Sequence, residues 1–237
     1  MHDCPHISFE SQSWCPRVQV AGVSSLEEAL FCRAVGVGAV GFTLELPSGT
    51  HDGLTKERAR AIIDRLPRDL LAVLITYLDS AVDAARLVDR LNVRAIQFHG
   101  DIADEQVRLF RSLRPAVRTI GRITVSGPSA LDHTNRVKPP LWDAVILDSF
   151  DPASGALGAT GITHDWSLSA RIVRRSSVPV ILAGGLNPEN VAAAIAAVRP
   201  HGVDAHTGLE NPDGSRNFQR IEAFSKAALE AFGTTRS

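Results

Sequence analysis

Two glycine-containing segments near the C-terminus constrain the fold of this chain more than any other feature. Residues 180–190 read VILAGGLNPEN, and residues 203–210 read VDAHTGLE. Each begins with a short apolar run, which is typical of a strand buried on both faces, and each reaches glycine where a loop or helix must begin. Glycine lets the backbone approach an anion, and a helix predicted over residues 189–198 presents its N-terminus. The pattern predicts a phosphate site at Gly184, Gly185, Thr207 and Gly208.

The loops after the last two strands of a β/α barrel are where a phosphate group usually binds, so the rest of the chain should supply six more strands. Apolar runs and helical spacing alternate throughout the chain without a break that would mark a domain boundary. We expect strands at residues 17–23, 39–44, 71–76, 95–98, 117–123, 142–147, 178–183 and 203–205. We expect helices at residues 26–34, 56–66, 81–91, 105–113, 129–137, 166–174, 189–198 and 218–232.

Eight strand and helix units are the number that closes a barrel, so the predicted fold class is α/β, a single (β/α)8 or TIM barrel. Residues 16–237 form this barrel, and residues 1–15, which show no periodicity, form an N-terminal extension. Helix starts are indicated by possible N-caps at Ser24 or Ser25, at Thr55 and at Asp165.

Composition excludes several classes of function. The chain has 237 residues, is 44% hydrophobic and carries a formal net charge of -1. Such a charge gives no basic field for nucleic acid, and no apolar run reaches the roughly 20 residues of a membrane span. Three cysteines, Cys4, Cys15 and Cys32, show no CxxC spacing, which argues against disulfides or a zinc site. We expect a cytoplasmic protein without cofactor, metal, nucleic-acid or membrane partner, either a monomer or a homodimer, that takes a small phosphorylated substrate.

A series of short motifs resembles the phosphoribosylanthranilate isomerase family of tryptophan biosynthesis, whose barrel performs an Amadori rearrangement. The motifs occur in the family's order and cover most of residues 17–230. They are Gly41-Phe42, Gln97-Phe98-His99-Gly100, Leu147-Asp148-Ser149, Ala159-Thr160-Gly161 before Asp165-Trp166, residues 182–190, and Val203-Asp204 with Thr207-Gly208-Leu209-Glu210.

Three departures from the family pattern concern the catalytic machinery. The family's general base is a cysteine at the end of the first strand, whereas this chain has Ala21, which has no titratable group. The loop at residues 47–53 lacks the arginine with which the family holds the anthranilate carboxylate. Gln19 stands where the family has a lysine. Cys15 precedes the first strand and Cys32 lies in the first helix, so neither should reach the carboxyl ends of the strands.

The rearrangement needs an acid for the ribose ring oxygen and a base for the C2 proton. The resemblance implies that Asp148 is the general acid, and loss of solvation at a strand end favours its protonated form. His99 touches the substrate or orients Asp148, and Arg122 contacts the substrate. Glu45, at the end of the second strand, is a candidate replacement base. The plain structural alternatives are loop capping for Asp148, a satisfied polar contact for His99 and a solvated carboxylate for Glu45.

Three functions remain open from the sequence. The first is Amadori-type isomerisation of a phosphoribosyl amine. The second is an isomerase or lyase reaction on another phosphorylated sugar or phosphoribosyl compound. The third is binding of a phosphometabolite without catalysis, since a binding protein tolerates the loss of a base.

Overall fold

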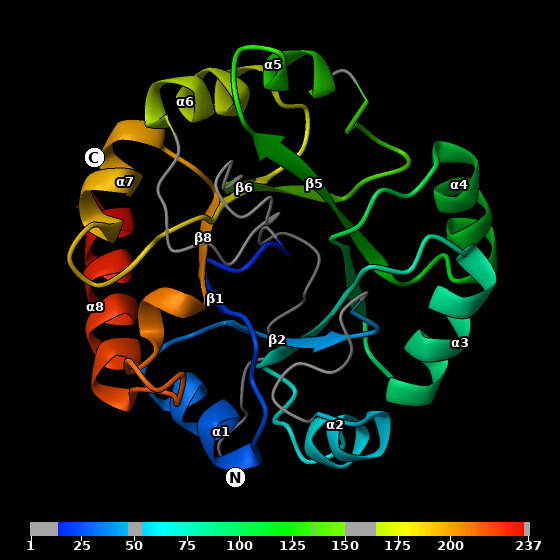
Figure 1. The fold of residues 1–237 in the computed structure, drawn as a ribbon, viewed down its shortest axis with the longest axis horizontal. Coiled ribbons are helices and arrows are strands. Elements are labelled where there is room, and N and C mark those ends of the chain that lie inside the picture. The colour runs from blue at the N-terminus through cyan, green and yellow to red at the C-terminus, as the bar shows by residue number, and fades with distance from the viewer. Residues whose placement is uncertain (1–13, 47–53, 135, 150–164, 235–237) are drawn as a thin grey trace, which may run out of the picture.

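The chain folds into a closed barrel of eight parallel strands surrounded by helices (Figure 1). The computed structural model describes residues 14–46, 54–134, 136–149 and 165–234. The strands follow one another around the barrel in chain order, and β8 closes it by pairing with β1. This arrangement confirms the predicted (β/α)8 fold.

The strands and helices alternate along the whole barrel. The strands are β1 (Val18–Val20), β2 (Ala39–Leu44), β3 (Leu71–Thr76), β4 (Ala95–Phe98), β5 (Arg118–Val125), β6 (Ala144–Ser149), β7 (Val180–Leu182) and β8 (Gly202–Ala205). The helices are α1 (Leu26–Ala34), α2 (Lys56–Ile63), α3 (Ala81–Leu91), α4 (Asp104–Leu113), α5 (Ala130–His133), α6 (Trp166–Arg175), α7 (Val191–Val198) and α8 (Phe218–Thr234), with a 3-10 helix, η1 (Thr207–Leu209), after β8.

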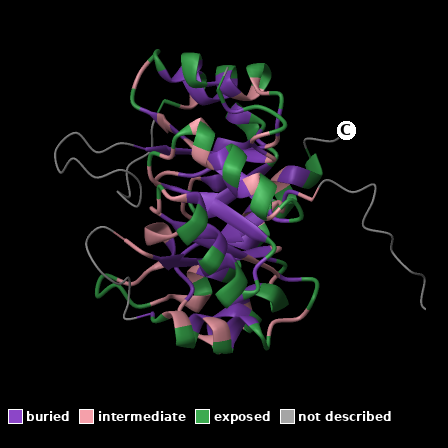
Figure 2. Ribbon diagram, turned by 90° about the vertical axis from the view of Figure 1, so that its right-hand side faces the viewer, coloured by how far each residue is buried: buried purple, intermediate pink, exposed green. Residues whose placement is uncertain are grey.

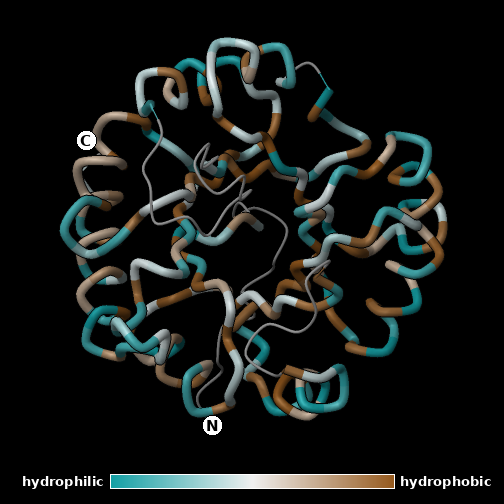
Figure 3. Tube along the Cα trace, viewed as in Figure 1, coloured by the Kyte–Doolittle hydropathy of each residue, from teal (hydrophilic) through white to brown (hydrophobic). Residues whose placement is uncertain are grey.

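Local side-chain hydrogen bonds determine where several helices begin. The side chains of Ser25, Thr55 and Asp165 accept hydrogen bonds from backbone N–H groups in the first turns of α1, α2 and α6, which confirms these predicted N-caps. The apolar faces of the helices then pack on the barrel, while their hydrophilic residues face outward (Figure 3). Among the described residues, no helix is long and apolar enough to cross a membrane.

Two apolar clusters form the core. The larger one lies between the strands and the surrounding helices, so the strands are buried on both faces (Figure 2). The smaller one fills the barrel interior with mostly small or β-branched side chains, which suit a narrow barrel. Its buried members are Cys15, Ala21, Ala39, Val73, Ile75, Ala95, Ile120, Ala144, Ile146, Ile181 and Ala183.

The amino end of the barrel interior is covered by residues that we assigned to the N-terminal extension. Cys15 is buried among the interior side chains, and the partly buried Trp14 packs against them. The barrel therefore begins before residue 16, because these side chains bury apolar surface there. Residues 1–13 of the predicted extension lie outside the described residues.

The fifth and sixth units differ most from the predicted boundaries. β5 extends to Val125, because Thr124 and Val125 pair with Asp148 and Ser149 of β6. Asp148 therefore lies within β6 rather than after it. The predicted helix at 129–137 is reduced to α5, since its polar sequence offers few apolar side chains to pack.

Candidate active site

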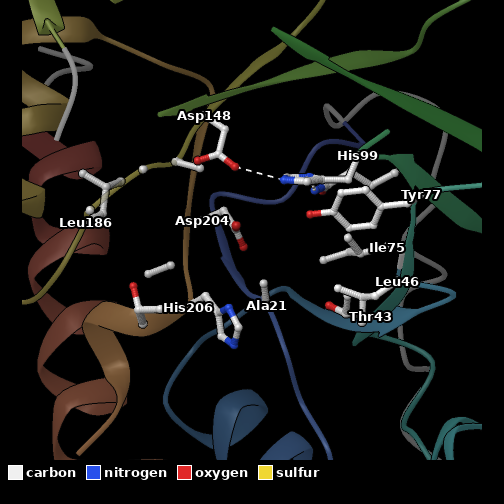
Figure 4. A pocket seen from close by; sticks show the side chains of 16 residues that line it. Ala21, Thr43, Leu46, Ile75, Tyr77, His99, Asp148, Leu186, Asp204 and His206 are labelled. Carbon is white, nitrogen blue, oxygen red and sulfur yellow. Dashed lines mark hydrogen bonds and ion pairs between the residues drawn. The ribbon is translucent and has the colours of Figure 1, made fainter. Parts of the chain in front are cut away.

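A pocket with a volume of about 90 Å³ opens at the carboxyl ends of the strands. Its walls come from seven strands or the loops that follow them, so residues distant in the sequence meet there (Figure 4). The residues that line it are Ala21, Thr43, Leu46, Ile75, Tyr77, Gln97, His99, Asp148, Ala183, Gly184, Gly185, Leu186, Asp204, Ala205, His206 and Thr207. Polar groups thus converge on one cavity at the end of the barrel where β/α-barrel enzymes carry their catalytic groups.

A chain of buried side chains crosses the barrel to Asp148. Gln19 Nε2 donates to Gln97 Oε1 over 3.1 Å, and Gln97 Nε2 lies 3.1 Å from His99 Nδ1. With Nδ1 accepting from Gln97, neutral His99 carries its proton on Nε2, which lies 3.0 Å from Asp148 Oδ2. The other carboxylate oxygen, Oδ1, accepts from Ser149 N over 2.8 Å. This contact places His99 where it could orient Asp148, the second of its two predicted roles, which stays a prediction.

Tyr77 completes this side of the pocket. Its ring meets the His99 ring edge to face, with the centroids 5.3 Å apart. Burial raises the pKa of Tyr77, so its hydroxyl stays protonated near neutral pH. The pair presents an apolar ring surface beside the Asp148 carboxyl group.

A second carboxyl group, Asp204, enters the pocket from β8. Asp204 is paired in register with Gln19 of β1 and is 7% exposed. Its Oδ1 has no hydrogen-bond partner among the described residues. Burial first and then the charge of Asp148 raise the pKa of Asp204 from 3.8 to about 7, against the opposing effects of a Gln19 hydrogen bond and the Arg216 charge. The pocket thus contains two carboxyl groups in different environments.

The loops after β7 and β8 bring together the residues of the predicted phosphate cup. Gly184 and Gly185 have positive φ angles of 81° and 64°, which side chains other than glycine rarely adopt. A Cβ atom at Gly208 would lie 2.0 Å from the carbonyl oxygen of Leu186, so the two loops touch only because this side chain is absent. Gly184, Gly185 and Thr207 line the pocket, and Gly208 follows them directly.

The N-terminus of α7 offers fewer free backbone N–H groups to this cup than the sequence predicts. The side chain of Asn187 accepts from the backbone N–H groups of Glu189 and Asn190, and the Asn190 side chain accepts from that of Asn187. These groups are satisfied within the turn, and α7 begins at Val191 instead of residue 189. The short helix η1 begins at Thr207 and presents its own N-terminus at the pocket, which the sequence reading missed.

At the end of β1, Ala21 offers only a methyl group. Its neighbour across the β1–β8 edge, His206, lines the pocket with Nε2 3.2 Å from Glu210 Oε1. Arg216 holds this corner together, since its Nε lies 2.8 Å from Glu28 Oε1 and its Nη2 donates to the Ala21 carbonyl oxygen. The Arg216 guanidinium thus already contacts the Glu28 carboxylate and the Ala21 carbonyl oxygen.

Glu45 does not lie where a replacement base would be useful. Its carboxylate forms an ion pair with Lys56 at the start of α2, and it is absent from the residues that line the pocket. Glu45 has a positive φ of 57° where the chain leaves β2, and the next residue, Leu46, lines the pocket instead. The structure therefore does not support the sequence-based choice of Glu45 as a base.

Arg122 is also outside the pocket wall. Its side chain is 6% exposed, and its Nη2 lies 3.6 Å from Asp101 Oδ1. Its Nη1 is buried without a hydrogen-bond partner among the described residues. The predicted substrate contact by Arg122 stays a prediction, and the loop at residues 47–53, where the family arginine is missing, lies outside the described residues.

Neither described cysteine can take the role of a base at position 21. Cys15 lies at the amino end of the barrel, and Cys32 faces the core from α1. Burial raises the pKa of each thiol to about 12, so neither is a thiolate at neutral pH.

The sequence reading missed Asp204 as a site residue, although a signal was present. A charged residue between Val203 and Ala205 in a strand buried on both faces must point into the barrel interior or be paired outside it. Only the register of β8 against β1 shows that it points into the pocket.

Comparison with known proteins gives a consistent result. The profile of a family described as N-(5'-phosphoribosyl)anthranilate (PRA) isomerase matches residues 22–227. N-(5'-phosphoribosyl)anthranilate isomerase 2 of Methanosarcina mazei is 35% identical over 221 residues, which are 93% of this chain and 97% of the relative. The corresponding isomerase of Desulforudis audaxviator is 36% identical over 214 residues, 90% of this chain and 98% of the relative.

Solved structures agree with this similarity. Phosphoribosyl anthranilate isomerase from Thermotoga maritima superposes with a TM-score of 0.77 at 30% identity, covering 90% of this chain and 98% of that one. A phosphoribosyl anthranilate isomerase solved with reduced 1-(o-carboxyphenylamino)-1-deoxyribulose 5-phosphate gives a TM-score of 0.74 at 28% identity, with the same coverage.

Proposed function

The chain belongs to the N-(5'-phosphoribosyl)anthranilate isomerase family, and from that premise we propose that it is an isomerase that converts N-(5'-phosphoribosyl)anthranilate by an Amadori rearrangement, a step of tryptophan biosynthesis. The observation that carries the proposal is the meeting of a glycine-rich anion cup and the His99–Asp148 pair in one pocket. The substrate carries a phosphate and, near it, the ring oxygen that must be protonated, so it needs an anion cup and a proton donor in the same pocket.

In this proposal the phosphate binds at Gly184, Gly185, Thr207 and Gly208, where a strand-end loop and the start of η1 present backbone N–H groups. The sugar then lies across the pocket toward β6. Asp148 protonates the ring oxygen as the bond from that oxygen to C1 breaks, and the nitrogen lone pair forms an iminium group. His99 holds the Asp148 carboxyl group in place through Oδ2.

Other parts of the proposal concern partners and location. We infer a small phosphorylated substrate and no nucleic-acid partner, because a net charge of -1 gives no attractive field for a polyanion. The unit is a monomer or a homodimer, and a solved Thermotoga maritima relative is named a dimeric isomerase from which monomers were generated. A cytoplasmic location fits the two described cysteines, which are free.

The test is turnover of N-(5'-phosphoribosyl)anthranilate by the purified protein, followed by chromatography of the product. The proposal expects an ordinary enzymatic rate, with kcat of about 1 per second or more. Calorimetry with reduced 1-(o-carboxyphenylamino)-1-deoxyribulose 5-phosphate separates the alternatives. Binding of this compound without turnover would favour a phosphometabolite-binding protein, and absence of both would favour a different phosphorylated substrate.

A further inference from the structure

We propose that Asp204 is the general base of the isomerisation and removes the C2 proton, in place of a side chain at position 21. The inference rests on the proposed function and identifies a residue that performs its second chemical step. Three observations support it: the position of Asp204 in the pocket, the hydrogen bonds of its carboxyl group, and the burial and charges around it, which differ from those of Asp148.

Position comes first. Asp204 lines the same pocket as Asp148, and Figure 4 shows its carboxyl group between Asp148 and Ala21. β8 lies beside β1 in the closed barrel, with Asp204 in register with Gln19, two residues before Ala21. The carboxyl group therefore approaches the sugar from the β1 edge, while Asp148 approaches it from β6. The ring oxygen and C2 are both bonded to C1, so an acid and a base on two sides of the sugar can act on them in turn.

Hydrogen bonding distinguishes the two carboxyl groups. Asp148 accepts at both oxygens, from Ser149 N and from His99. Asp204 Oδ1 is buried and has no such donor among the described residues. An acceptor left unpaired inside a pocket is costly unless a ligand uses it, and a C–H proton that is about to leave is such a partner.

Burial is the main reason that the pKa of Asp204 is raised, and the negative charge of Asp148, from β6, raises it further. A hydrogen bond from Gln19 and the charge of Arg216, before α8, oppose the rise. The side chain facing it from β1 is Gln19, a neutral amide, and the other titratable groups that line the pocket near these strands are His99, Tyr77 and His206. With a pKa of about 7, a large fraction of Asp204 is ionised at neutral pH, and a general base is most effective when its pKa lies near the working pH.

The step balances without any further reactant. The Asp204 carboxylate takes the proton from C2, the C–H electron pair forms the C1–C2 double bond, and the iminium π electrons return to nitrogen. The resulting enaminol becomes the ketone when its C2 hydroxyl loses a proton and C1 gains one. Asp204 can return its proton to C1, and the hydroxyl proton can restore Asp148.

His206 is the competing candidate, because it also lies beside Ala21. Its Nε2 is next to the Glu210 carboxylate, and its carbonyl oxygen accepts from Arg216. Both residues line the pocket, but these contacts tie His206 to the corner that joins β8 with the loop before α8, whereas Asp204 Oδ1 has no hydrogen-bond partner among the described residues.

The experiment compares the parent with Asp204→Asn and His206→Gln, using N-(5'-phosphoribosyl)anthranilate for turnover. Asp204→Asn should lower kcat by about 10²- to 10⁴-fold, the range of general-base catalysis, while His206→Gln should stay within about tenfold of the parent. Calorimetry with reduced 1-(o-carboxyphenylamino)-1-deoxyribulose 5-phosphate should give both variants nearly the parent's affinity, which shows that the fold and the pocket are intact.

A second readout is rescue. Adding Ala21→Cys to Asp204→Asn places a thiol next to the lost base. The double variant should have a kcat at least tenfold higher than that of Asp204→Asn alone. Parent-like turnover by Asp204→Asn, or the large loss appearing in His206→Gln instead, overturns the assignment and leaves the proposed function standing. A parent that does not turn the substrate over refutes the proposed function itself, and the assignment of Asp204 with it.

Discussion

Replacing Asp204 with asparagine should make the protein more stable at alkaline pH, although the same change should inactivate it. The buried carboxyl group is tolerated as a neutral acid but destabilises the native state when ionised. Asparagine keeps the shape and stays neutral at every pH. The stability difference between variant and parent should therefore grow as the pH rises.

The magnitude follows from the pKa of Asp204. It rises from 3.8 to about 7 on folding, so the native state binds more protons than the unfolded state between these values. The free energy of unfolding then falls as the pH rises through this window, and a shift of about three units corresponds to about 4 kcal/mol in total. About 2.5 kcal/mol of this loss falls between pH 5 and pH 8. In this range Asp204 is almost fully ionised in the unfolded state, whereas in the native state it loses its proton only near pH 7.

The assay is urea unfolding of the parent and of Asp204→Asn at pH 5 and pH 8. Asp83→Asn is the matched control, because the Asp83 side chain lies on the surface and is 53% exposed. Subtracting the parent at each pH removes the contributions of the other titrating groups. A difference between Asp204→Asn and the parent that is the same at both pH values, as in the control, would refute the reasoning that Asp204 is a buried, destabilised acid.

Two further predictions concern the acid and the anion cup. Asp148→Asn should lower kcat by about 10²- to 10⁴-fold, and it should also reduce the pH dependence of stability, because the negative charge that raises the pKa of Asp204 is gone; steady-state kinetics and the same urea series check both parts. Gly208→Ala should weaken the binding of inorganic phosphate at least tenfold, since its Cβ would collide with the carbonyl oxygen of Leu186 at 2.0 Å. Gly127→Ala, where nothing lies within 4 Å of the added Cβ, should leave binding unchanged in the same calorimetric titration.

The sequence by itself determined the barrel and indicated where in it a phosphate site is predicted. Apolar runs that end in glycine, separated by segments of helical spacing, give eight β/α units, and each of these units is present in the structure. The glycines at 184 and 208 are needed for backbone reasons that operate within a few residues, so the cup could be predicted from local patterns. The N-caps at Ser25, Thr55 and Asp165 were predictable for the same reason.

Only the tertiary structure decided which polar side chains share the pocket. Glu45 and Asp204 both lie at or near strand ends in the sequence, yet Glu45 pairs with Lys56 and does not line the pocket, while Asp204, in register with Gln19 of β1, does. The pairing of Gln97, His99 and Asp148 likewise spans β4 and β6. The direction of a side chain at a strand end depends on register and turn geometry, which are fixed by contacts between distant segments and leave no local signal in the sequence.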